Sequence, residues 1–180
     1  MSGTPTGLVL ALLSEFASDM RASRTINQLA LSTGKAYANT HATTTQLLKE
    51  EILLKETVGH SHQCRLNLNN DKTLLYISLL ETVKRDELLR KSPEMRLLLS
   101  RVDTHSAKLG VLLAWKREND LLLVTTSHQP DPTELFSIPV SILPLAAFMH
   151  DQNLRATISG KNTLLFGHAL YASLLREVRR

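Results

Sequence analysis

Hydrogen-bonding side chains are concentrated in one short segment, residues 35–48, with the sequence KAYANTHATTTQLL. Asparagine can pair with adenine, threonine methyl groups suit the methyl of thymine, and a lysine at a helix start can contact a phosphate. The segment is polar, small and almost uncharged, so it could read the edges of DNA bases. The candidate contacts on it are Lys35, Tyr37, Asn39, Thr40, His41 and Thr44.

A second group of reactive types follows as His60, His62 and Cys64, an HxHxC pattern. Alternate strand residues share one face, and all three types can bind a metal ion. Three such residues spread over ~13 Å, however, which is too far to surround one ion. We therefore expect no metal site and no cofactor. The single cysteine also excludes an internal disulfide and fits a reducing cytoplasm.

Two helices joined by a tight turn must position the polar segment. Helical spacing predicts a first helix over 7–20, and Thr25 can cap a second helix that ends at Gly34. The polar segment would then be a third helix, over about 35–50. We expect its buried stripe to be Ala38, Ala42, Thr45 and Leu48, which leaves the candidate contacts on the outside.

A hairpin follows the third helix. Strand residues at 52–54 and 64–68 flank a tip at 58–62 that contains a glycine. In this order of elements, residues 8–70 resemble the winged-helix domains of bacterial and archaeal transcriptional regulators. The resemblance implies that helix 35–48 enters the major groove and that the wing, 58–63, lies over the minor groove or the backbone. Outside the helix, the candidate DNA contacts are Arg24, Thr25, His60, His62 and Arg65.

The region 72–105 reads as two leucine-rich helices separated by Pro93. It contains more leucine than one small domain needs, so we expect a connector that also forms a homodimer interface. The preceding region, 1–71, would be the DNA-binding domain. The remainder, 106–180, changes from helical to extended spacing and would be a small α/β domain. Its unbroken apolar runs, 111–115 and 121–125, predict strands covered on both faces, and 136–143 is a further candidate strand.

Two segments of this C-terminal region resemble minimal nucleotidyltransferases of archaea, LGVLLAWKRENDLLLVTT (109–126) and NTLLFGHALYASLLREV (162–178). The resemblance implies a nucleotidyltransferase-like fold behind a winged helix. In that family a Gly-Ser pair holds the nucleotide phosphates and carboxylates hold Mg²⁺. Here Ala114-Trp115 stands in place of Gly-Ser, only Glu118 and Asp120 could supply the acids, and no third carboxylate follows in FSIPVSIL. We therefore expect no catalytic residues and no enzyme.

The composition supports a folded chain that does not span a membrane. The chain has 180 residues, 43% hydrophobic, and a net charge of +4, with no apolar run long enough to cross a bilayer. Basic and acidic residues nearly balance in 1–70, so non-specific attraction to DNA should be weak.

These observations favour a cytoplasmic, homodimeric, sequence-specific double-stranded DNA-binding protein, a transcriptional regulator. Its predicted fold is an α+β winged helix, a helical connector and an α/β domain. Two alternatives remain: a divergent nucleotidyltransferase or toxin-antitoxin component, and a winged helix used for protein-protein contact.

Overall fold

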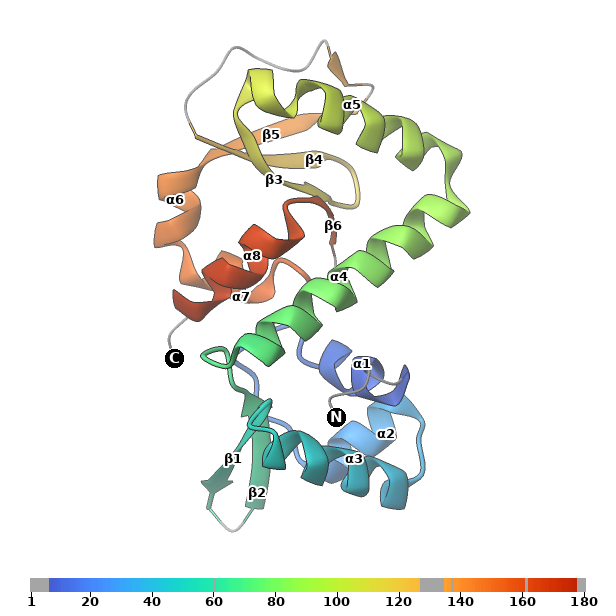
Figure 1. Cartoon of the computed structure of the whole chain (residues 1–180), viewed down its shortest axis with the longest axis vertical. Helices are drawn as coiled ribbons and strands as arrows, with labels where there is room; N and C mark the ends of the chain where they lie inside the picture. The colour runs from blue at the N-terminus through green and yellow to red at the C-terminus, as the bar shows by residue number, and fades with distance from the viewer. Residues whose placement is uncertain (1–6, 60, 127–134, 137, 161, 178–180) are drawn as a thin grey trace.

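The computed structural model describes residues 7–59, 61–126, 135–136, 138–160 and 162–177 (Figure 1). Within these residues the chain has a mixed α+β fold with eight α-helices, a two-strand hairpin and a four-strand mixed sheet. The elements of the N-terminal part are α1 (Gly7–Ser14), α2 (Ile26–Thr33), α3 (Tyr37–Lys49), β1 (Leu53–Val58) and β2 (Ser61–Leu66). Two long helices follow, α4 (Asp71–Lys91) and α5 (Pro93–Leu109). The C-terminal part contains β3 (Val111–Lys116), β4 (Leu121–Thr125), β5 (Val140–Pro144), α6 (Leu145–His150), α7 (Gln152–Thr157), β6 (Thr163–Phe166), α8 (His168–Leu174) and a 3-10 turn at Leu175–Glu177.

Helix α2 begins and ends where the sequence predicts. The Thr25 side chain accepts from the backbone N–H of Gln28, and the Gln28 side chain accepts from the N–H of Thr25, so a complete capping box starts the helix. Gly34 ends it in a left-handed conformation with φ of 63°. Helix α1 is shorter than expected, because it stops at Ser14, whose hydroxyl donates back to the Ala11 carbonyl at 2.7 Å.

The strands of the hairpin are longer than the sequence predicts. Strands β1 and β2 pair from Leu53 with Leu66 out to Val58 with Ser61, and Gly59 turns the chain with a φ of 59°. An isolated bridge between Arg24 and Cys64 attaches the segment before α2 to the edge of β2. The hairpin is therefore held on one side by the start of α2.

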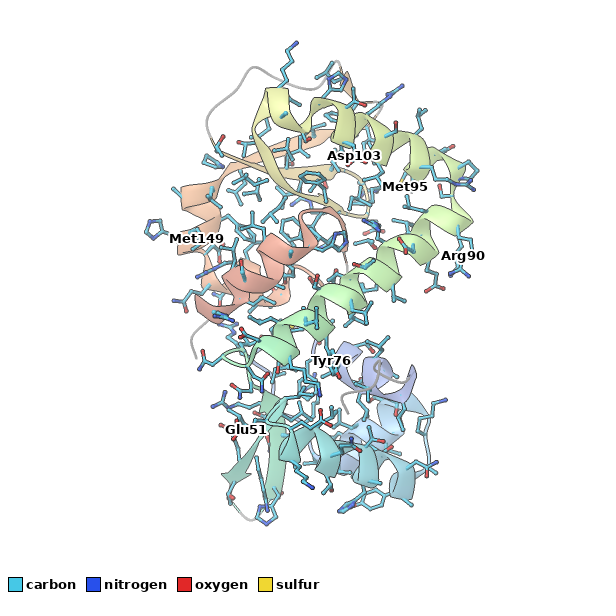
Figure 2. All side chains as sticks on the ribbon, viewed as in Figure 1. Glu51, Tyr76, Arg90, Met95, Asp103 and Met149 are labelled. Carbon is cyan, nitrogen blue, oxygen red and sulfur yellow. The ribbon has the colours of Figure 1, made fainter. Side chains whose placement is uncertain are left out.

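Helix α4 joins the two parts of the molecule (Figure 1). Its cap is Asn70 and not the next residue, Asp71, since the Asn70 side-chain oxygen accepts from the N–H of Lys72 and of Thr73. The inner face of α4 packs on α1 at one side and on β6 and α8 at the other. Tyr76 lies on the side of α4 that faces the N-terminal elements (Figure 2).

One hydrophobic core runs through both parts. It includes Leu12 and Phe16 of the N-terminal part, Ile77 of α4, and Trp115 and Tyr171 of the C-terminal part. Direct hydrogen bonds also cross the boundary: the Met20 N–H donates to the Ala156 carbonyl at 2.9 Å, and the Arg21 guanidinium donates to the Asn153 side chain at 2.8 Å. The two parts are thus packed against each other, not joined by α4 alone.

The four-strand sheet has the order β5-β4-β3-β6, with β5 parallel to β4 and the other pairs antiparallel. Helix α5 covers one face through Leu98 and Val102, whereas Phe148 of α6 and Tyr171 of α8 pack against Trp115 on the other. Every residue of β4 is buried, which confirms the prediction that its unbroken apolar run is a strand covered on both faces. Strand β5 is shorter than the predicted 136–143.

Candidate nucleic-acid interface

Thr40 and Thr44 are fully buried and do not lie on the outer face of α3. They form the inner stripe of the helix together with Leu47, at i, i+4 and i+7. The predicted stripe ends at Leu48 instead of its neighbour Leu47, and a shift of one residue rotates a helix by about 100°. Thr40 and Thr44 are therefore corrected from candidate DNA contacts to core residues.

The outer face of α3 is made of small side chains. Ala38, Ala42 and Thr45, predicted to be buried, are exposed, and Lys49 continues their row at the end of the helix. A shallow depression runs along this face. Its lining residues are Ala42, Thr45, Gln46, Lys49 and Glu50. The helix itself contains no acidic residue, so its outer face is apolar and cationic, with polar amides at its edges.

Four predicted contacts remain exposed at this surface. Lys35, Tyr37, Asn39 and His41 are all solvent-accessible. The rings of Tyr37 and His41, one turn apart, contact each other at a centroid distance of 5.9 Å. This pair covers the side of α3 near its start, while Asn39 lies toward the opposite edge.

The wing supplies fewer cations than its sequence suggests. Arg65 donates to the Glu56 carboxylate on the neighbouring strand at 2.9 Å, and Glu56 also accepts from the Ser23 hydroxyl at 3.0 Å. The charge of Arg65 is thereby compensated within the protein. His62 is exposed, with its Nδ1 at 3.4 Å from the Thr57 hydroxyl, and His60 lies outside the described residues.

Arg24 and Thr25 stand where the chain enters α2. The Thr25 hydroxyl accepts from the Gln28 N–H at 3.1 Å, so its oxygen already caps the helix. The backbone of Arg24 pairs with Cys64, which leaves its half-buried side chain as the available group. Of these two predicted contacts, Arg24 is the one that adds charge to the surface.

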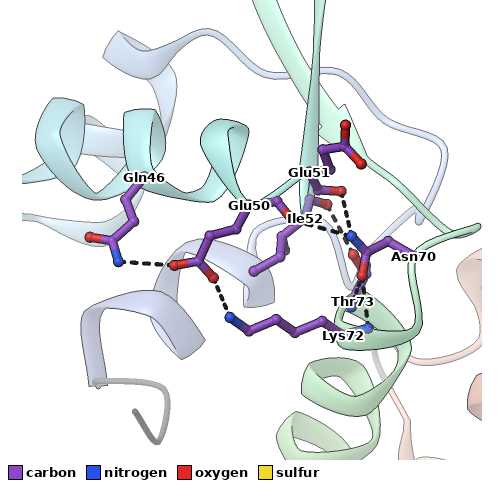
Figure 3. Close-up of polar contacts among 7 residues, drawn as sticks. All are labelled: Gln46, Glu50, Glu51, Ile52, Asn70, Lys72 and Thr73. Atoms are coloured by element: carbon purple, nitrogen blue, oxygen red, sulfur yellow. Dashed lines mark hydrogen bonds and ion pairs between the residues drawn. The ribbon is translucent and has the colours of Figure 1, made fainter. Parts of the chain in front are cut away.

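Sequence reasoning missed the corner that joins α3 to the wing and to α4 (Figure 3). Glu51 adopts a φ of 55° there, which an L-residue rarely does. Its carbonyl accepts from the amides of Asn67 at 2.8 Å and Asn70 at 3.2 Å, and Asn70 also donates to the Glu50 carbonyl. The signal in the sequence is the Asn-x-Asn-Asn run that follows β2.

An ion pair closes the same corner. The Lys72 ammonium pairs with the Glu50 carboxylate, which also accepts from Gln46 at 2.9 Å. Lys72 and then Gln46 hold the pKa of Glu50 below its usual range. These contacts fix the end of α3 to the start of α4, so that the outer face of α3 has a set orientation toward the rest of the molecule.

Of the two acidic residues that would serve a nucleotidyltransferase, Asp120 is engaged within the protein. Asp120 forms an ion pair with Arg117 and accepts from the Ser141 hydroxyl at 2.8 Å, and the Arg117 contact lowers the pKa of Asp120. Glu118 is exposed in the turn between β3 and β4.

Burial raises the pKa of the Cys64 thiol, which disfavours the thiolate that metals bind. Among the described residues, no cluster of three or more His, Cys, Asp or Glu is placed to hold a metal.

No protein-family model, curated protein or solved structure matches this chain. Among the helices that the structure describes, none has the length and apolar character needed to cross a membrane.

Proposed function

We propose that the chain is a sequence-specific, double-stranded DNA-binding protein of the winged-helix type, a cytoplasmic transcriptional regulator that acts as a homodimer. The carrying observation is the exposed outer face of α3, a helix with no acidic residue of its own, set beside a hairpin wing that is tied to the start of α2. Helix α3 lies in the major groove, and β1–β2 contacts the backbone or the minor groove.

The chemistry of the face favours A·T base pairs. Ala38, Ala42 and Thr45 present methyl groups that suit the thymine methyl, and Asn39 at the edge carries an amide that can pair with adenine. Guanine is most often read by arginine or lysine, and the middle of this face has neither. Lys35 and Lys49 stand at the two ends, where phosphates would lie.

For the C-terminal part we propose a nucleotidyltransferase-like platform that lacks catalysis. The support is that Asp120 is held by Arg117 and Ser141. The platform carries α4 and α5, and through them it positions the DNA-binding part.

Duplex binding measured over a salt series tests the proposal. Fluorescence anisotropy is followed with an A·T-rich duplex and a G·C-rich duplex of equal length. We expect affinity to fall with salt, a preference for the A·T-rich duplex, and a loss of about tenfold for each base contact removed in Asn39→Ala and His41→Ala. Lys35→Ala should reduce the salt slope by about one.

Thr40→Val is the matched control, since it changes the same helix on its buried side and should leave binding unchanged. A salt slope near zero for both duplexes would contradict DNA binding and favour a protein-protein role for the same surface. Equal affinity for the two duplexes, together with an affinity that falls with salt, would contradict only the A·T preference.

A further inference from the structure

Helix α4 presents an apolar row to solvent. Leu75 is 65% exposed and Val83 is 44% exposed, with the half-buried Leu79 between them. The three residues follow one another at intervals of four, so they share one face of the helix. This face is opposite to Leu74, Ile77 and Leu80, which pack into the core.

The row is symmetric about Leu79. Leu75 and Val83 lie four residues on either side of it, and Lys72 and Asp86 lie seven residues on either side. All five positions fall on the same side of α4. If a second α4 runs antiparallel with its Leu79 against this one, leucine meets valine and lysine meets aspartate in both copies at once.

We propose that this face, formed by Lys72, Leu75, Leu79, Val83 and Asp86, binds the same face of a second copy of the chain in an antiparallel arrangement. The interface is isologous, because each residue and its partner exchange roles under the two-fold axis. The charges at its ends are opposite: Lys72 pairs within its own chain with Glu50, and Asp86 with Arg85, so the two-fold axis brings one ion pair beside the other. Antiparallel helices also oppose their dipoles favourably. A parallel pair would instead place Asp86 beside Asp86 and Lys72 beside Lys72.

The size of the face sets the strength of the dimer. The segment 72–86 is about 22 Å long at 1.5 Å per residue, and a helix is roughly 10 Å wide. This is well below the roughly 800 Å² per partner of a standard stable interface. We therefore expect a weak, reversible dimer, which two adjacent DNA half-sites would strengthen by effective concentration.

Sedimentation of the full chain without DNA measures the dimer directly. We expect concentration-dependent dimerisation, weakened at least tenfold by Leu75→Glu combined with Val83→Glu. Leu97→Glu on α5 is the matched control, since Leu97 is 57% exposed but lies outside the face. Circular dichroism shows whether each variant is folded. A chain that stays monomeric at every concentration, or a dimer that resists the double change, would overturn the proposal.

Cross-linking tests the orientation with variants that keep the face largely apolar. Packed helix axes lie about 8–10 Å apart, within reach of a short bifunctional maleimide. Leu79→Cys should cross-link to itself, whereas Leu75→Cys and Val83→Cys should cross-link only when mixed, since like positions would lie ~12 Å apart along the axis. Buried Cys64 makes the unmodified chain the background control.

Self-linking of Leu75→Cys alone would overturn the antiparallel arrangement. This inference rests on the proposed function in one respect, namely that the chain acts as a homodimer. Because its tests contain no DNA, the dimer and the DNA binding can fail separately.

Discussion

The backbones of Arg24 and Cys64 exchange two hydrogen bonds, 2.9 Å from the Arg24 N–H to the Cys64 carbonyl and 2.7 Å from the Cys64 N–H to the Arg24 carbonyl. The residues lie 40 positions apart, and the pair forms an isolated antiparallel bridge at the edge of the wing. Since Arg24 directly precedes the Thr25 cap, the start of α2 and the wing are held together as one surface.

Arg24→Pro tests this bridge, because proline removes one of the two donors. We expect a loss of about 1–3 kcal/mol in the free energy of unfolding, measured by urea denaturation, from the buried carbonyl left unpaired. Arg24→Ala keeps both backbone bonds and should change stability by less than about 0.5 kcal/mol. Equal stability of the two variants would contradict a structural role for the bridge.

The buried hydroxyls of Thr40 and Thr44 have no hydrogen-bond partner among the described residues. Replacing such a group by an apolar one of the same shape removes a desolvation cost. Thr44→Val should therefore raise the free energy of unfolding by about 1 kcal/mol, and thermal melting would detect it. Thr45→Val, one residue along on the exposed face, should change the free energy of unfolding little. A destabilised Thr44→Val would mean that the Thr44 hydroxyl forms a hydrogen bond in the folded protein.

Asn70 both caps α4 and holds the carbonyls of Glu50 and Glu51. Asn70→Ala should cost about 1–2 kcal/mol of stability, because a cap and two carbonyl contacts are lost together. Asn69→Ala is the control in the same loop, since Asn69 is exposed, and it should stay within about 0.5 kcal/mol. Chemical denaturation of both variants makes the comparison.

Glu81 is a fully buried residue of α4, and the Lys84 ammonium contacts its carboxylate at 3.1 Å and also donates to the Ser159 carbonyl at 2.6 Å. Burial raises the pKa of Glu81, against a lowering effect of Lys84. The folded state then binds the proton more tightly than the unfolded state. The contribution of Glu81 to stability is thus fully present below the unfolded pKa and is lost as pH rises through the raised folded pKa.

Glu81→Gln removes this titration. We expect the variant to gain stability relative to the wild type as pH rises above about 4.5, the usual glutamate range, in urea denaturation at a series of pH values. Glu87→Gln, on the exposed side of α4, should show no such gain. A difference that stays flat with pH would mean that folding leaves the pKa of Glu81 unchanged, and a variant that loses stability relative to the wild type as pH rises would mean that Lys84 lowers that pKa.

The positions of most elements could be predicted from the sequence, because their signals are local. The Thr25 cap, the Gly34 stop and the all-apolar run of β4 each act within one turn or one strand, and each is confirmed. The shortened α1 and β5 show the limit of such signals, since helical or extended spacing continues past the point where the hydrogen bonds end.

The orientation of α3 was decided only by the tertiary structure. The sequence offers Leu47 and Leu48 side by side, and either could anchor the helix. Packing against the rest of the N-terminal core selects Leu47, which buries Thr40 and Thr44 and turns Ala38 and Ala42 outward. A face of mixed small residues carries too little contrast in hydrophobicity to settle this from spacing alone.

What the chain itself determined is therefore the order of its elements and the types of side chain that each one carries. Long-range contacts decided which of those side chains reach solvent, as in the bridge from Arg24 to Cys64 and the ion pair of Arg65 with Glu56. The physical reason is that a local pattern fixes backbone conformation, whereas exposure and net charge at a surface depend on neighbours that are distant in sequence.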